Sequence, residues 1–337
     1  MRTALFLTCD DSAAGYLKAR YRTYAPRPEI VPLPVRLIRA PITGLDGKFG
    51  VTSGISRRED ATGQGGRHLL HPDVELGIAD ILRRWRDAER VEFYVDPDPN
   101  SQLLMTLLLT CMLGAGVDLR KLFLMHGPVR WGQVDAFKPP IEIATSLQAE
   151  GSHFEVAASV WTAYCAPTPE PWLTLRRQDI AVFPYLEAAM DALLDDLPRH
   201  KNGLGACEHL ALARIGADGT TLNEVVAAFY QDPVRRLIDV SQIIALLSSL
   251  ADGATPLIEG LQGRLHAEDY HEDADAWNGL GGSRLRLTDV GRRILAGELD
   301  FIEAHGIDRW WGGTHLIASA CWRWNFETRT LMPPIGG

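Results

Sequence analysis

Apolar residues follow two alternating patterns along the first third of the chain, and these patterns predict its elements. Short apolar runs typical of β-strands cover residues 3–8, 35–39, 91–95 and 121–125. Between them, apolar residues recur at helical spacing over 12–22, 74–85 and 101–113. Strands that alternate with helices are typical of βαβ units. We therefore expect a Rossmann-like α/β domain with a parallel sheet over residues 1–140.

The pattern becomes mainly helical after residue 140. Prolines interrupt two helical patterns over residues 141–203, which we expect to form a helical linker region. Further helices are predicted at 206–215, 222–230 and 240–250, and strand-like runs at 256–259 and 284–287. Three helices, a two-stranded wing and a closing helix follow the order of a winged helix. Residues 204–337 are therefore expected to form a winged-helix-like domain with a tryptophan-rich strand at its end.

Composition adds expectations about the environment of the protein. A length of 337 residues exceeds what one hydrophobic core usually organises, which agrees with more than one domain. The longest apolar stretch, 103–117, is short and interrupted by glycines, so we expect a buried helix and no membrane span. The five cysteines are odd in number and widely spaced. Reduced thiols and a cytoplasmic location are therefore favoured over a disulfide framework.

Ionisable side chains follow three of the four predicted strands. The residues concerned are Asp10, Asp11 and Ser12 after the first strand, Asp96 and Asp98 after the third, and His126 after the fourth. Ligands of α/β sheets bind beyond the carboxyl ends of the strands. Clustered carboxylates beside a histidine can bind a divalent cation or act as acid and base. The sequence thus predicts a cleft for a small molecule at this edge, with a divalent metal as a candidate cofactor.

The same residues have a purely structural alternative. Aspartate and serine before a helix are preferred N-caps, and the sequence DPDPN at 96–100 is typical of a turn. The chain has neither a P-loop nor the Rossmann glycine pattern, so nucleotide binding is only weakly indicated. Capping and ligand binding both stay open on the sequence alone.

The charge of the winged-helix-like region argues against DNA as a partner. Residues 199–300 contain ten basic and fifteen acidic side chains, a balance of the wrong sign for phosphate contacts. The expected recognition helix, 241–250, has no Arg or Lys and a single Gln. We therefore favour contact with a protein partner or a second copy of the chain.

The expected wing contains two histidines, His266 and His271, among five acidic residues. These two side chains are candidate metal ligands. No standard ligand spacing accompanies them, and a solvated loop is the simpler explanation of such a charge run.

Tryptophans concentrate near the end of the chain, where five of the nine follow residue 276. The strings RWWGGTHL (309–316) and CWRWN (321–325) are the most distinctive in the sequence. One interpretation is an aromatic lid that packs at a domain interface. In the other, His315 and Arg323 face the α/β cleft and contact the ligand.

These strings resemble the end of bacterial proteins in the domain-of-unknown-function 1835 family, whose members often carry an uncharacterised C-terminal partner domain. The resemblance extends to residues 11–14 and 183–186, to Pro198 with residues 202–204, and to residues 287–288 with Gly291. Asp10 stands where the family pattern has Gly, and Asn325 where it has Asp. The resemblance implies the two-part layout and no particular reaction.

Together these features predict a small-molecule- or metal-binding protein whose winged-helix-like module contacts another protein. A metabolite-tailoring enzyme that uses the same cleft is the first alternative. A transcription regulator is the second.

Overall fold

The structure is a computed structural model that describes residues 4–39, 42, 73–134, 145–216, 218–232, 234–252, 254–261 and 281–334. The chain divides into two compact units. Unit 1 comprises Met1–Met190 and Trp310–Thr314, and unit 2 comprises Asp191–Arg309 and His315–Gly337. None of the helices in the described part is long and apolar enough to cross a membrane. All five cysteines are free thiols.

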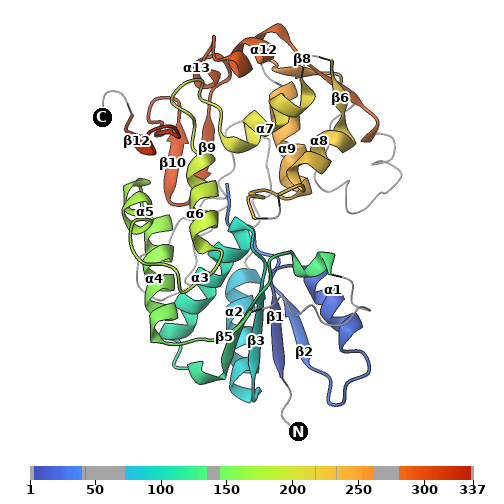
Figure 1. The fold of residues 1–337 in the computed structure, drawn as a ribbon, viewed down its shortest axis with the longest axis vertical. Helices are drawn as coiled ribbons and strands as arrows, with labels where there is room; N and C mark the ends of the chain where they lie inside the picture. Colours follow the sequence, from blue (N-terminus) through green and yellow to red (C-terminus); the bar gives the residue numbers. More distant parts are fainter. Residues whose placement is uncertain are drawn as a thin grey trace. The chain divides into compact units, whose positions relative to one another are not determined.

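Unit 1 is built on a five-stranded sheet in the order β2-β1-β3-β4-β5, whose strands lie side by side in Figure 1. The parallel strands are β1 (Leu5–Thr8), β2 (Glu29–Pro32), β3 (Val91–Val95) and β4 (Leu122–His126). The edge strand β5 (Thr145–Gln148) runs antiparallel to β4. The expected α/β fold is present, but β5 makes the sheet mixed and not purely parallel.

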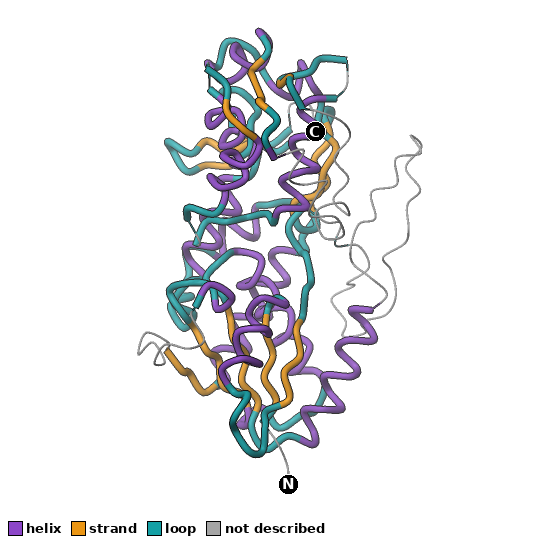
Figure 2. The backbone as a smooth tube through the Cα atoms, turned by 90° about the vertical axis from the view of Figure 1, so that its right-hand side faces the viewer, coloured by secondary structure: helices purple, strands orange, loops and turns teal. Residues whose placement is uncertain are grey.

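Helices cover both faces of this sheet (Figure 2). The parallel strands are connected through α1 (Asp11–Arg20), α2 (Asp73–Asp87) and α3 (Pro99–Gly114), and two short 3-10 helices, η1 (Leu119–Lys121) and η2 (Trp131–Gln133), flank β4. After β5 come α4 (Gly151–Tyr164), α5 (Glu170–Leu175) and α6 (Leu186–Asp195). Across the sheet, β2 lies on one side of β1, whereas β3 and then β4 lie on its other side. Right-handed crossovers therefore place α1 on one face and α2 and α3 on the opposite face.

The second strand is where the sequence prediction was wrong. A strand was expected at 35–39, but β2 lies at Glu29–Pro32. The Asn100 side chain explains the difference, because it accepts a hydrogen bond from the Leu37 N–H and donates one to the Val35 carbonyl, both 2.8 Å long. These backbone groups are thus held by the start of α3 and do not join the sheet.

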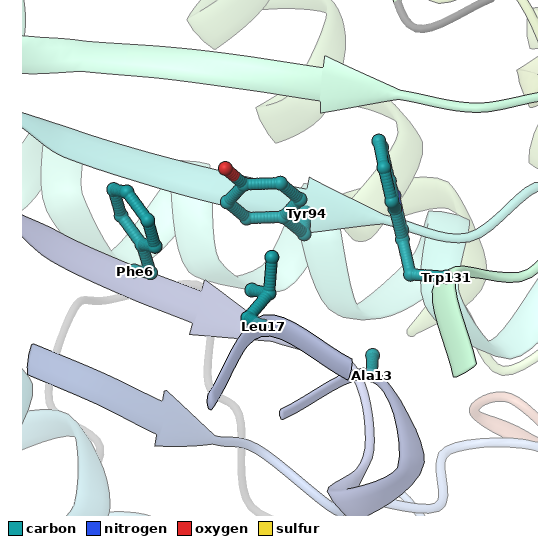
Figure 3. Packing of buried hydrophobic residues seen from close by; sticks show 5 residues of the cluster. All are labelled: Phe6, Ala13, Leu17, Tyr94 and Trp131. Atoms are coloured by element: carbon teal, nitrogen blue, oxygen red, sulfur yellow. The ribbon is translucent and has the colours of Figure 1, made fainter. Parts of the chain in front are cut away.

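An aromatic core fixes α1 and η2 against the sheet. It consists of Phe6, Ala13, Leu17, Tyr94 and Trp131. The Tyr94 ring lies between the other two rings, with centroids 5.3 Å from Phe6 and 5.0 Å from Trp131 (Figure 3). Because Trp131 lies beyond the carboxyl ends of the strands, this core also positions the loop that leads from β4 to η2.

Unit 2 contains helices α7 (Ala206–Ile215), α8 (Leu222–Phe229), α9 (Val240–Ala251), α12 (Asp289–Ala296) and α13 (Phe301–His305). Its antiparallel sheet has the order β6-β8-β7, formed by β6 (Thr220–Thr221), β7 (Ile258–Glu259) and β8 (Arg284–Leu287). The helices expected at 206–215, 222–230 and 240–250 correspond closely to α7, α8 and α9. The two-residue strand β6 was not predicted, since it is too short to show a period.

Two hairpins end the chain. β9 (Asp308–Trp311) pairs with β10 (Thr314–Ile317), and β11 (Arg323–Asn325) with β12 (Thr330–Met332). Trp311, which belongs to unit 1, is buried with its ring centroid 5.6 Å from that of Tyr164 and 5.8 Å from that of Trp172. The tryptophan-rich strand expected near the end of the chain corresponds to β11, which contains the fully buried Trp324, whereas Trp322 precedes the strand.

We predict opposite effects on stability for two glycines of unit 1. A Cβ on Gly132 would lie 2.5 Å from the Cβ of Ser12 at the start of α1, so Gly132→Ala is expected to destabilise the protein by about 1–3 kcal/mol. A Cβ on Gly15, inside α1, meets nothing within 4 Å, so Gly15→Ala is expected to stabilise it by about 1 kcal/mol. Urea unfolding curves measure both changes. Equal effects of the two substitutions would contradict the close approach of η2 to α1.

Candidate functional site

Three aspartates converge on one arginine at the carboxyl edge of the sheet in unit 1. Arg130 lies in the loop between β4 and η2, and its Nη2 donates a hydrogen bond to Asp10 Oδ2. Its Nε lies 3.6 Å from Asp96 Oδ2 and 3.6 Å from Asp98 Oδ2. We call these four residues the Arg130 cluster. Two strands and one loop, far apart in the sequence, therefore meet in a single group of charges.

Two members of the Arg130 cluster are also helix caps. Asp10 Oδ1 accepts the Ala13 N–H at 2.7 Å, and Asp98 Oδ1 accepts the Ser101 N–H at 3.1 Å. The capping interpretation of these aspartates is thus correct. Each nevertheless turns its second carboxylate oxygen towards the arginine. Capping fixes the orientation of the two carboxylates and leaves the charge cluster in place.

Asp96 is the buried member of the Arg130 cluster, with 0% of its surface exposed. Its Oδ1 accepts the Trp131 N–H at 2.7 Å, while its Oδ2 accepts no hydrogen bond from any described residue. Burial raises its pKa to about 7, with further increases from the charges of Asp98 and Asp10 and an opposing effect of Arg130. Near neutral pH this carboxyl group exists in both protonation states, as an acid–base group requires.

The structure separates the other rim candidates from the Arg130 cluster. Asp11 and Ser12 lie exposed in the first turn of α1. Arg130 itself was missed, because the search stopped at the residues directly after each strand. A search that also included the short loop from β4 to η2 would have found Arg130, a basic side chain at the same edge of the sheet as the three aspartates.

His126 lies at the same edge but projects to the opposite face of the sheet, so the expectation that it joins the aspartates was wrong. It shares one face of β4 with Leu122 and Leu124, and all three are buried, whereas Met125 on the other face packs against the aromatic core beside α1. Its ring lies 6.4 Å from that of Phe183, whereas the Arg130 cluster lies on the α1 side with Trp131. Burial, and secondarily the charge of His153, lowers the pKa of His126 to about 4.

His315 and Arg323 belong to unit 2, and each is paired within it. His315 Nε2 lies 2.7 Å from Asp308 Oδ1. Arg323 Nη2 donates to Asp300 Oδ1 at 3.0 Å, which is a partly buried ion pair beside the buried Trp324. Both side chains are thus paired with aspartates of unit 2.

The described residues offer little to a metal ion. They contain no group of three or more His, Cys, Asp or Glu side chains arranged to hold one. Within the Arg130 cluster the guanidinium already lies against all three carboxylates and supplies the positive charge beside them. His266 and His271 fall outside the described residues.

Comparison with known proteins adds no assignment. No protein-family model matches the chain, and no curated protein gives a match. The resemblance to the domain-of-unknown-function 1835 family therefore stays a prediction, and the functional argument depends on the geometry of the site.

We predict that Asp96 makes the stability of the protein fall as the pH rises. The folded protein keeps the Asp96 proton up to about pH 7, whereas the unfolded chain releases it near the ordinary value of 3.8. The folded state therefore binds more protons between these values, and the stabilisation present at low pH is lost as the pH rises through about 7. Asp96→Asn retains an acceptor for Trp131 N–H but cannot ionise.

Relative to the wild type, the free energy of unfolding of Asp96→Asn should therefore increase by a few kcal/mol between about pH 4 and pH 8, as a tenfold change in proton affinity is worth about 1.4 kcal/mol. Urea titrations across this range measure the difference. Asp11→Asn is the matched control, since that carboxylate is exposed and outside the Arg130 cluster. Parallel pH profiles of wild type and Asp96→Asn would refute the assignment.

Proposed function

We propose that unit 1 binds a small polar molecule at the Arg130 cluster. The observation that carries this proposal is the Asp96 carboxylate, which is fully buried, close to two other carboxylates, and left with one oxygen that accepts no hydrogen bond from the described residues. Burying a carboxylate in this way lowers the stability of the folded protein, and helix capping alone does not require such burial. Its position at the carboxyl edge of an open α/β sheet is where ligands of this fold class bind.

The charges of the Arg130 cluster favour one class of ligand. Three carboxylates face a single guanidinium, so the cluster keeps a negative balance even when Asp96 is protonated. A ligand with hydroxyl or amino donors matches this balance, whereas a phosphate would be repelled. Asp10 and Arg130 have side chains that are 13% and 14% exposed, so they are the members that an incoming ligand meets first.

A second candidate function is an enzyme that uses the same cluster, and the pKa of Asp96 near 7 favours it. A buried carboxyl group beside specific charge partners is the usual setting of a general acid or base. Asp96 would then transfer a proton to or from the bound molecule, while Arg130 and Asp10 hold it. Conversion of the bound molecule during incubation distinguishes this enzyme from a binding protein.

We infer that part of unit 2 is a winged helix that contacts protein and not DNA. The order α7, β6, α8, α9, β7, β8 and the sheet order β6-β8-β7 support the fold. The side of α9 that is not buried consists of small or uncharged residues, namely Ser241, Gln242, Ala245, Ser248, Ser249 and Ala251. This face lacks the Arg and Lys side chains that phosphate binding requires.

The binding proposal predicts that a small molecule accompanies the native protein through gentle purification. Native mass spectrometry should detect it on the wild type and on Asp11→Asn. The latter is the control, because it makes the same Asp-to-Asn change at an exposed residue outside the Arg130 cluster. Asp96→Asn and Asp10→Asn should each reduce its occupancy at least about tenfold, the effect of losing a charged hydrogen bond of about 1.5–3 kcal/mol. Equal occupancy in all four proteins would contradict the proposal.

The inference about α9 predicts no electrostatic binding to DNA. Fluorescence anisotropy with a labelled duplex of random sequence should show no binding at micromolar protein, and no change between low and moderate salt. Binding that weakens steeply with added salt would instead support the transcription regulator. A circular-dichroism spectrum of the same sample confirms that the protein is folded.

A further inference from the structure

His126 occupies a position where folding alone favours an apolar side chain. It is the last residue of β4, it is 1% exposed, and the register places it beside Val95. Neither of its ring nitrogens has a hydrogen-bond partner among the described residues. Leaving both groups of a buried ring unsatisfied is unfavourable, and an apolar ring of similar shape would avoid that penalty.

The surroundings of His126 are aromatic. Its ring centroid lies 6.4 Å from that of Phe183 and 6.3 Å from that of Tyr185, and the His153 ring of α4 lies 5.4 Å from Phe183. Burial lowers the pKa of His126 and that of His153, so both imidazoles are neutral at pH 7. Strand β4, helix α4 and the segment before α6 thus bring together two neutral imidazoles, with Phe183 beside both and the Tyr185 phenol beside His126.

The hydrogen-bonding capacity of this group follows from the tautomers. A neutral imidazole has one N–H donor and one acceptor nitrogen, and within the described part of the chain His126 uses neither. His153 Nδ1 accepts the Glu150 N–H at 3.1 Å, so its ring proton lies on Nε2, where it can be donated. Tyr185 adds a hydroxyl group that can donate or accept.

We propose that His126, His153 and Tyr185 form a second binding site, which takes an uncharged nitrogen heteroaromatic molecule. The flanking rings offer faces for a planar ligand, and the imidazoles offer donors and an acceptor for its edge. A charged ligand would lose its hydration here without gaining an opposite charge from these three side chains. The site lies on the face of the sheet opposite to the Arg130 cluster, so it is independent of the function proposed there.

Access to His126 involves the Tyr185 side chain. Phe183 is buried, whereas Tyr185 is partly exposed and lies in a turn segment just before α6. Because the Tyr185 ring centroid lies 6.3 Å from that of His126, the entry route that we propose is rotation of this phenol about its Cα–Cβ bond. The ligand then takes the place of the displaced phenol beside the His126 ring.

The test is a titration of the full chain, labelled with ¹⁵N at histidine, with imidazole, indazole and adenine at about pH 8, where all three probes are mostly uncharged. Long-range proton–nitrogen spectra report each ring nitrogen of His126 directly. We expect at least one of these probes to move the His126 signals in the wild type and in Asp96→Asn. His126→Phe, which retains a ring, should bind that probe at least about tenfold more weakly while unfolding at the same or a higher urea concentration.

Two results would overturn the proposal. One is the absence of any shift of the His126 signals with all three probes at millimolar concentration. The other is unchanged probe affinity in folded His126→Phe. If that variant does not fold, which would itself show a structural role for the imidazole, the wild-type titration and Tyr185→Phe still decide whether the site binds these probes.

Discussion

The arrangement of unit 1 at its carboxyl edge depends on the contact between Arg130 and three aspartates. Two of these carboxylates begin α1 and α3, and the third ends β3, so their mutual repulsion would otherwise act on the start of two helices. The guanidinium balances part of that charge from a loop after β4. One side chain thereby ties together three strand ends that have no sequence proximity.

Trp131 links this electrostatic contact to the hydrophobic core. Its backbone N–H donates a hydrogen bond to Asp96 Oδ1, while its ring packs against Tyr94. The position of Arg130, one residue earlier, is therefore set by aromatic packing as well as by charge. A buried carboxylate with a raised pKa can persist there because the core beside it holds the loop in place.

The sequence predicted most of the fold because helical periods and buried strands leave strong patterns. Helix α3 and strand β8 were found in this way, whereas β5 was missed because its residues are mostly exposed. The candidate site was predicted only in part. The strand-end rule located Asp10, Asp96 and Asp98, but it carries no information on which face of a sheet a side chain takes, and so it grouped His126 with them.

The missed arginine illustrates a more general limit. Pairing between Arg130 and Asp10 joins residues 120 positions apart, and nothing local in either segment indicates the other. Such contacts depend on the completed topology, here on the position of β3 between β1 and β4 in the sheet. The capping role of Asp10 was predictable because it acts within four residues of chain.

Unit 1 is discontinuous in the sequence, since Trp310–Thr314 returns to it after nearly all of unit 2. Gly313 donates its N–H to the Tyr164 carbonyl at 2.8 Å, and Trp311 completes the cluster with Trp172. During synthesis on the ribosome, these residues emerge only after the helices of unit 2 have been made. The first unit to begin folding is consequently among the last to be completed, and a nascent chain that stalls before residue 311 carries an aromatic cluster with one of its rings missing.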